Sequence, residues 1–196
     1  MRAEALIGPN AVLQLVPVLD HACGPAQRQR LLRDAGIIHL PDASRMIPEA
    51  LPARLLMALR AALPEQAPGI AAEAGRRTAD YLIAHRIPGR ARRLLHHLPR
   101  ALAAELLSRA IARHAWTFAG SGRFRIAARR PRTFEITANP LASGEAVEPL
   151  CHWHTAVFEG LFQTLIDRRL RVREMGCCAA GDSACRFVLA RPSSPA

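Results

Sequence analysis

The chain has 196 residues, a formal net charge of +11 and no lysine, so arginine supplies all 27 of its non-histidine basic residues. This length fits one domain with its own core, and the absence of lysine excludes Schiff-base and lysine-nucleophile chemistry. The excess of arginine favours an anionic partner, which is nucleic acid, a phospholipid surface or a ligand that carries carboxylates.

Helices are predicted for the first half of the chain. Apolar residues recur at helical spacing over residues 10–23, 26–34, 51–63, 70–87 and 100–116. Gly24 and Pro25 end the first of these segments, and prolines bound the third and fourth. Residues 1–119 are therefore expected to be mainly helical, and the apolar stripes are expected to pack together in a core.

A change of period after Gly120 predicts a β-hairpin. Apolar residues alternate with other residues over 124–128 and again over 134–138, and an Arg-Pro-Arg sequence separates the two runs. Helical spacing returns over residues 147–166, where Cys151 falls on the apolar side.

Two strands are predicted near the end of the sequence. Leu170, Val172 and Glu174 share one face of the first strand, residues 185, 187 and 189 share one face of the second, and residues 180–182 carry a turn signal. The expected fold class is α+β: a helical N-terminal half followed by antiparallel β-hairpins and one helix, with the sheet covered on one face.

Glu174 is the most informative residue of the last hairpin. Its place on an inward face buries a carboxylate, which is costly unless a positive group meets it. Thiols from separate elements reach the same region, because Cys151 lies on the preceding helix, Cys185 opens the neighbouring strand and Cys177 lies between them. Three thiolates and one carboxylate make the four ligands of a closed tetrahedral zinc site. The alternative is a group of small buried cysteines without a metal.

Strict alternation along the strand conflicts with this ligand set, because it places Glu174 on the side of Cys178 and not of Cys177. Gly176 offers a resolution. Glycine within a strand often marks a bulge, and one extra residue turns Cys177 toward the face of Glu174. Cys178 is then left without a role.

The segment from Cys151 to Phe187 resembles the 4-vinyl reductase domain family, in a pattern that here runs C…E-x-x-C-x-x-x-G-D-x-x-C-x-F. The resemblance implies a single ligand-binding domain over residues 1–196, with the core of the family domain and a zinc-binding hairpin in residues 120–191. Sensor members of the family carry zinc in this pattern, which implies a structural zinc in this chain. The ligand positions carried over are Cys151, Glu174, Cys177 and Cys185.

Three further segments, IGPNAVLQ, YLIAHRIP and HAWTFAGSGRF, are similar to the family members that serve bacteriochlorophyll synthesis. This similarity implies binding of a porphyrin or chlorophyllide intermediate, carried around the steps of magnesium chelatase and the following methyltransferase. The family name implies a second function, reduction of the 4-vinyl (8-vinyl) group of a divinyl chlorophyllide or protochlorophyllide. No dinucleotide-binding G-x-G-x-x-G follows a predicted strand, so such a reductase needs an external electron donor. The third class is a sensor domain for small aromatic compounds, which we disfavour because sensors usually join a regulatory or ATPase domain and none is expected after Arg191.

Aromatic and histidine side chains are the candidates for a tetrapyrrole pocket. A large apolar ring system needs aromatic walls, and magnesium takes an axial nitrogen. A lone histidine is more often a surface or core residue, and core packing explains the YLIAHRIP pair about as well. The candidates are Trp116, Phe118, Trp153, His114, His154, Tyr81 and His85.

Neither a secretory signal nor a run of about 18 apolar residues is found in the sequence. We therefore expect a cytoplasmic protein that lies peripherally at the photosynthetic membrane. The arginines are scattered, and no aromatic residues alternate with their densest cluster at residues 90–93, so we expect no nucleic-acid binding. Relatives in the family imply a homodimer.

Overall fold

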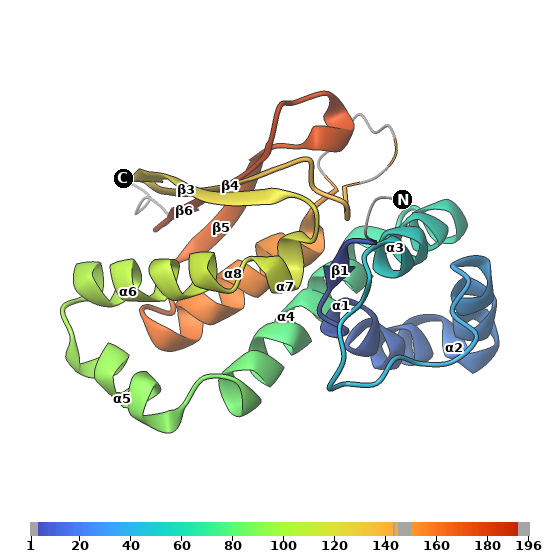
Figure 1. Cartoon of the computed structure of the whole chain (residues 1–196), viewed down its shortest axis with the longest axis horizontal. Helices are drawn as coiled ribbons and strands as arrows, with labels where there is room; N and C mark the ends of the chain where they lie inside the picture. The colour runs from blue at the N-terminus through green and yellow to red at the C-terminus, as the bar shows by residue number, and fades with distance from the viewer. Residues whose placement is uncertain (1–3, 143, 145–149, 192–196) are drawn as a thin grey trace.

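Helices occupy most of the chain before Gly120 in the computed structural model, which describes residues 4–142, 144 and 150–191 (Figure 1). The helices are α1 (Asn10–Leu13), α2 (Leu15–Asp34), α3 (Ala50–Ala62), α4 (Ala67–His85), α5 (Gly89–His97), α6 (Arg100–Arg113), α7 (Trp116–Ala119) and α8 (His152–Leu165). The strands are β1 (Leu6–Ile7), β2 (Ile47–Pro48), β3 (Arg123–Arg129), β4 (Arg132–Thr137), β5 (Arg171–Gly176) and β6 (Cys185–Ala190). The predicted α+β class is confirmed.

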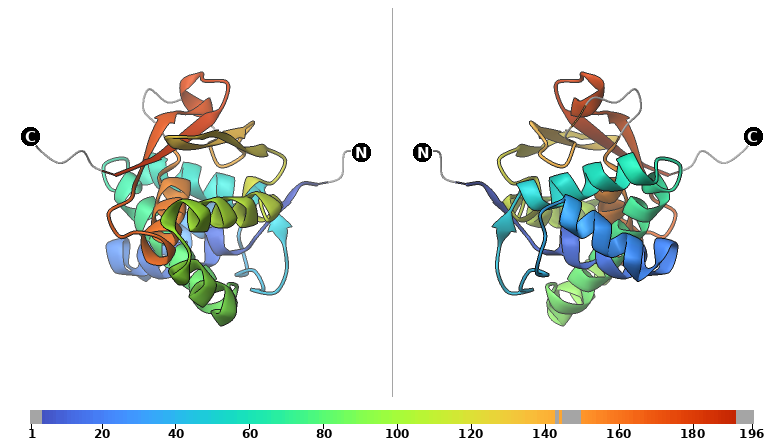
Figure 2. Two further views of the ribbon diagram at one scale, coloured as in Figure 1. Left: turned by 90° about the vertical axis from the view of Figure 1, so that its left-hand side faces the viewer. Right: turned by 90° about the vertical axis from the view of Figure 1, so that its right-hand side faces the viewer.

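The main sheet has four antiparallel strands in the order β3-β4-β6-β5. Both predicted hairpins form, β3 with β4 and β5 with β6. The sequence did not predict that β4 pairs with β6, in a register that places Phe134 opposite Phe187. Figures 1 and 2 show α8 lying under this sheet, with the helical part of the chain beyond it.

All six phenylalanines of the chain pack between α8 and the sheet. Phe134, Phe158, Phe162 and Phe187 are almost completely buried. Phe158 contacts Phe134 and Phe187 with ring centroids 5.2 and 5.3 Å apart, mostly edge to face. Such aromatic pairs add to the stabilisation that burial of the rings already provides. The cluster attaches α8 to the inner face of the sheet.

Local breaks divide the helical half as proline and glycine predict. Gly24 has φ 78° and interrupts α2, which confirms the predicted end of the first helical segment. The segment predicted at 100–116 is shorter, because α6 ends at Arg113 and α7 begins at Trp116. The ring Nδ1 and backbone N–H of His114 both bond to the Ala110 carbonyl and so terminate the helix.

The last helix begins later than its periodicity predicted. Residues 147–149 lie outside the described residues, and α8 begins at His152, so Cys151 precedes the helix and is not on its apolar stripe. The physical reason is a side-chain cap: a carboxylate oxygen of Glu174 accepts a hydrogen bond from the Cys151 backbone N–H at 2.9 Å. The short sheet of β1 and β2, two residues each, is below the length at which alternation is recognisable. No helix among the described residues has both the length and the apolarity to cross a membrane.

Two glycines let α4 and α8 cross closely. A Cβ on Gly75 would lie 2.4 Å from the Trp153 carbonyl oxygen and 2.8 Å from the Ala156 Cβ. A Cβ on Gly160 would lie 2.7 Å from the Ala79 Cβ. Helix backbones approach this closely only where small residues meet.

We predict that Gly75→Ala destabilises the protein by about 1–3 kcal/mol, because the added methyl group overlaps the backbone of α8. Gly69→Ala is the matched control in the same helix, since nothing lies within 4 Å of a Cβ at Gly69. Alanine is favoured over glycine in a helix by up to about 1 kcal/mol, so the control should be neutral or stabilising. Urea denaturation of both variants measures the difference, and equal midpoints would contradict the close crossing.

Candidate functional site

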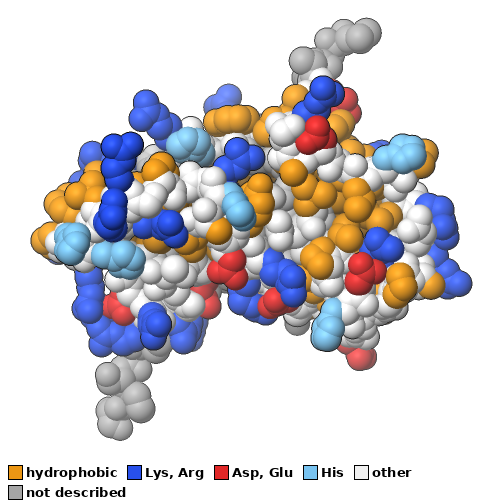
Figure 3. Space-filling view, turned by 90° about the horizontal axis from the view of Figure 1, so that it is seen from below, with side chains coloured by type: hydrophobic (Ala, Val, Ile, Leu, Met, Phe, Trp, Pro, Cys, Tyr) orange, Lys and Arg blue, Asp and Glu red, His pale blue; other side chains and the backbone are white. Residues whose placement is uncertain are grey.

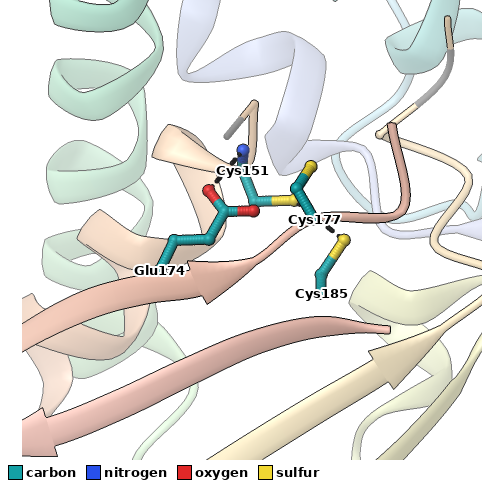
Figure 4. Close-up of side chains that lie close together, drawn as sticks. All are labelled: Cys151, Glu174, Cys177 and Cys185. Carbon is teal, nitrogen blue, oxygen red and sulfur yellow. Dashed lines mark hydrogen bonds between the residues drawn. The ribbon is translucent and has the colours of Figure 1, made fainter. Parts of the chain in front are cut away.

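Four side chains from separate elements meet at one end of the sheet (Figure 4). Their ligand atoms all lie within 4.8 Å of one another. Glu174 comes from β5, Cys177 follows that strand, Cys185 opens β6 and Cys151 immediately precedes α8. Cys151, Cys177 and Cys185 are buried and Glu174 is partly exposed. The structure thus brings together all four residues that the sequence predicted as metal ligands.

A β-bulge at the end of β5 orients Cys177. Glu174 pairs with Phe187 and Gly176 pairs with Arg186, so two steps along β5 oppose one step along β6. The predicted bulge at Gly176 is therefore confirmed. The side chain of Met175 is 63% exposed, which shows that the extra residue points away from the core.

The loop after the bulge is held by its own hydrogen bonds. A carboxylate oxygen of Asp182 accepts from the Cys177 N–H at 2.8 Å, and the Cys177 carbonyl accepts from the Asp182 N–H at 3.2 Å. Residues Cys178–Ala180 form one 3₁₀ turn, and Gly181 follows with φ 89°, a left-handed conformation that favours glycine. This loop sets the separation of Cys177 and Cys185.

Nitrogen donors surround the three sulfurs. The Leu150 N–H donates to the Cys177 Sγ at 3.4 Å, and the Cys178 N–H donates to the Cys185 Sγ at 3.4 Å. The side-chain amide of buried Asn139 lies 3.3 Å from the Cys151 Sγ and 3.5 Å from the Cys185 Sγ. Donors of this kind stabilise thiolates and orient metal ligands.

Sequence analysis treated Asn139 only as a breaker before Pro140. The signal was present in part, because Asn139 directly follows β4, and β4 was already a predicted strand. Its Oδ1 accepts from the Leu141 N–H at 3.1 Å, an Asx turn that aims the amide nitrogen at the sulfurs. The missing information was that β4 pairs with β6, which brings Asn139 beside Cys185.

Charge at the cluster is unbalanced without a cation. Burial raises the pKa of the Glu174 carboxyl, and its Oε1 has no hydrogen-bond partner among the described residues. Hydrogen bonds from the Cys151 thiol to Cys177 and Cys185, together with burial, raise the pKa of Cys151 well above its ordinary value. Burial lowers the pKa of Arg60 on α3, while the Cys151 and Cys177 sulfurs act in the opposite direction. Arg60 is therefore a cation near the cluster that the sequence did not reveal.

Cys178 lies beside the cluster without joining it. Its half-buried thiol donates to the Ile136 carbonyl oxygen at 3.7 Å, a weak bond. The described geometry thus agrees with the sequence prediction that Cys178 is not one of the four ligands.

The seven predicted pocket residues lie in three different places. Phe118, Trp153 and His154 belong to the aromatic core, where the His154 ring centroid is 5.0 Å from that of Trp153 and 6.1 Å from that of Phe118. Tyr81 and His85 stack on each other along α4, with ring centroids 4.7 Å apart. His114 and Trp116 are exposed around the junction of α6 and α7.

A groove of about 530 Å³ lies between α5, α6 and the end of α8. Its apolar lining includes Leu95, Leu98 and Leu165, and His96 and Arg100 add polar groups. This volume falls within the range of about 300–1,000 Å³ typical of small-molecule sites. None of the seven predicted pocket residues lines this groove.

His154 is the most deeply buried titratable group beside these residues. Its Nε2 lies 3.2 Å from the Phe118 carbonyl oxygen, and its Nδ1 has no partner among the described residues. Burial lowers the pKa of His154 from 6.5 to about 4. The imidazole is therefore neutral in the folded protein at physiological pH.

We predict a loss of stability in acid that depends on His154. The unfolded chain binds more protons than the folded chain between the two pKa values, so the full stability present above pH 6.5 falls as pH drops toward 4, by roughly 3 kcal/mol in total. Denaturation of wild type and His154→Phe across this range measures the effect, with exposed His114→Gln as the control. A stability profile of His154→Phe that parallels the wild type would contradict it.

Comparison with known proteins places this cluster within a family pattern. A model of the family described as the vinyl-4-reductase domain matches residues 133–191, which include all four clustered residues. The chain is 51% identical over 184 residues to the bacteriochlorophyll synthase 23 kDa chain of Cereibacter sphaeroides, covering 93% of this chain and 89% of that protein. It is 46% identical over 186 residues to the chain of the same name from Rhodobacter capsulatus, covering 95% and 87%.

Solved structures share the fold at low sequence identity. An H-NOX protein from S. oneidensis in the Fe(II)NO ligation state has a TM-score of 0.62 at 11% identity, covering 95% of this chain and 100% of that one. The phenol-responsive sensory domain of the transcription activator PoxR, solved with phenol, has a TM-score of 0.55 at 15% identity, covering 85% and 90%. At these identities the likeness concerns the fold.

Proposed function

This chain belongs to the vinyl-4-reductase domain family and is a homologue of the bacteriochlorophyll synthase 23 kDa chains, and from that premise we propose that it binds a tetrapyrrole intermediate and presents it to enzymes of the pathway. A role in bacteriochlorophyll biosynthesis follows from homology over nearly the full length. The same homology carries the finer proposal, because every intermediate of that pathway after ring closure is a flat, largely apolar macrocycle with carboxylates. Magnesium chelatase and the following methyltransferase are the partners that we propose on either side of it.

The fold supports a macrocycle as ligand. One H-NOX structure with a TM-score of 0.57 is described as a study of heme distortion in that family, so a protein of this fold holds a tetrapyrrole. The groove between α5, α6 and α8 is our candidate seat. Its leucines suit the ring, and the imidazole of His96 is the nearest candidate for an axial nitrogen.

The rim of the groove suits the carboxylates of the ligand. Arg100 lines it, and Asp167, which follows the groove residue Ile166, pairs with Arg100, Arg169 and Arg191. Three arginines around one aspartate leave an excess of positive charge. Because guanidinium groups bind carboxylates through paired hydrogen bonds, this rim is suited to propionate side chains.

Titration with magnesium protoporphyrin tests the proposal. We expect a shifted Soret band and quenched tryptophan emission at micromolar ligand, and no response to phenol. Arg100→Gln should weaken binding roughly three- to tenfold through loss of a charge-assisted hydrogen bond. Arg76→Gln is the matched control, because Arg76 is similarly exposed and pairs with Glu73 on α4, away from the groove. An unchanged spectrum at micromolar ligand would overturn the proposal.

The same preparation separates a carrier from an enzyme. Purified protein is incubated with divinyl chlorophyllide and either NADPH or reduced ferredoxin, and the pigment is analysed by chromatography. We expect unchanged substrate. A monovinyl product would replace the carrier function with vinyl reduction.

We further propose that the four clustered residues hold a structural zinc ion. Three thiolates and one carboxylate are a zinc donor set, and the spread of the ligand atoms within 4.8 Å is close to the edge of about 3.7 Å in a tetrahedron with zinc–sulfur distances near 2.3 Å. The buried Glu174 Oε1 without a partner needs a cation. Zinc would supply the charge that lets the three thiols and the carboxyl deprotonate together, and Arg60 would offset the net negative charge that remains. Four protein ligands leave no position for water, so the ion would fasten α8 to the last hairpin.

Elemental analysis tests the ligand set. We expect about one zinc per chain in the wild type, and loss of the metal together with a fall in melting temperature of roughly 10 °C, about 3 kcal/mol, in Cys185→Ser. Cys178→Ser is the matched control, since that thiol lies outside the cluster, and it should keep its zinc. Full zinc occupancy in the double variant Glu174→Ala and Cys177→Ser would refute the ligand set.

A further inference from the structure

One end of the molecule combines arginine with exposed leucine. Residues 86–113, which include α5 and α6 and which we call the α5–α6 arm, contain seven arginines and one acidic residue. Figure 1 shows the arm at one end of the molecule, and Figure 2 shows α5 projecting from the body. Neither the cluster of three cysteines and Glu174 nor the six-phenylalanine core lies on this arm.

The arm has an inner and an outer face. Leu95, Ala103 and Leu107 are buried and attach it to the body. Three further leucines point outward, with exposed fractions of 54%, 46% and 37% for Leu94, Leu102 and Leu106. Leu102 and Leu106 are one helical turn apart on α6, so their side chains share one face. Three large apolar side chains exposed on two successive helices exceed the scattered exposure that is normal for a protein surface.

Most arginines of the arm are free of acidic partners within the described part of the chain. The only acidic residue of the arm, Glu105, is occupied by Arg109 on the arm and by Arg129 and Arg132 of the sheet. Arg90, Arg93 and Arg113 form no ion pair with any described residue. Figure 3 shows blue and pale-blue side chains interspersed with orange ones at this end of the molecule.

We propose that the α5–α6 arm docks on an anionic phospholipid membrane, with both helices lying in the plane of its surface. Arginines interspersed with exposed leucines are the composition of an interfacial amphipathic segment, because guanidinium groups bind lipid phosphates while leucines enter the boundary of the acyl chains. Charge complementarity selects the occupant, since the uncompensated arginines of the arm require a surface dense in negative charge. A single-stranded nucleic acid also carries that charge, but no aromatic side chain of α5 or α6 offers a stacking platform.

The strength of docking depends on both components. Each arginine near an anionic surface contributes roughly fivefold to the partition coefficient, an effect that salt screens. The leucines contribute through buried apolar area and do not depend on salt. Docking does not rest on tetrapyrrole binding, because the residues that carry it lie outside the groove, whose lining includes Leu95, His96 and Arg100.

Co-sedimentation of the full chain with vesicles tests the docking surface. We expect binding to vesicles of phosphatidylcholine with 30% phosphatidylglycerol, weak binding to phosphatidylcholine alone, and release as salt is raised. The double variant Arg90→Gln and Arg93→Gln should lose roughly 20-fold in partition coefficient. The triple variant Leu94→Ser, Leu102→Ser and Leu106→Ser should also lose binding while retaining its circular dichroism spectrum, because these side chains are exposed.

Matched controls carry the same changes elsewhere on the surface. Arg45→Gln with Arg173→Gln removes the same charge from two other exposed positions, and Met175→Ser removes an apolar side chain that is 63% exposed on β5. Both controls should bind vesicles like the wild type. Failure of the wild type to sediment with anionic vesicles, or equal losses in the control and arm variants, would overturn the proposal. Tetrapyrrole titration in solution without vesicles gives an independent result, so the two proposals can fail separately.

Discussion

The carboxylate of Glu174 joins the start of α8 to the last hairpin, and the positions of the other parts of the site depend on that junction. One oxygen accepts the Cys151 N–H, while the other is buried without a hydrogen-bond partner in the described structure. Leaving a carboxylate oxygen unsatisfied in a protein interior is unfavourable, so the cluster is stable as an anionic site only with a cation at its centre. The sulfurs of Cys151, Cys177 and Cys185 converge on the same point.

The junction matters because α8 is the central element of the fold. On one side it packs against the sheet through the phenylalanine cluster, with Phe158 at the centre of several ring contacts. On the other side it crosses α4 at backbone distance, where Gly75 and Gly160 leave no room for a Cβ. A large ligand therefore has no space between α4 and α8, whereas the groove at the end of α8 is open to α5 and α6. The cysteine cluster and the groove are located at opposite ends of the same helix.

Much of this arrangement was predictable from local patterns. The parity of Glu174 against Cys177 required a bulge, Gly176 was the residue able to provide it, and the strand register contains that bulge. The end of the first helical segment at Gly24 and both hairpins were predictable for the same reason, because turns and breaks depend on residues that are adjacent in sequence. The cap at Cys151 was not, since it depends on Glu174, 23 residues further along the chain.

Sequence was sufficient for the fold class, the four clustered residues and the family, because periodicity and short-range spacing report which side of an element is apolar and where a chain must turn. It was insufficient for the pairing of β4 with β6, which brings Asn139 to the sulfurs, and for the proximity of Arg60. It also did not show that Leu94 is exposed while its neighbour Leu95 is buried. Each of these depends on contacts between segments distant in the chain, and periodicity does not report which element covers an apolar face or leaves it open to solvent.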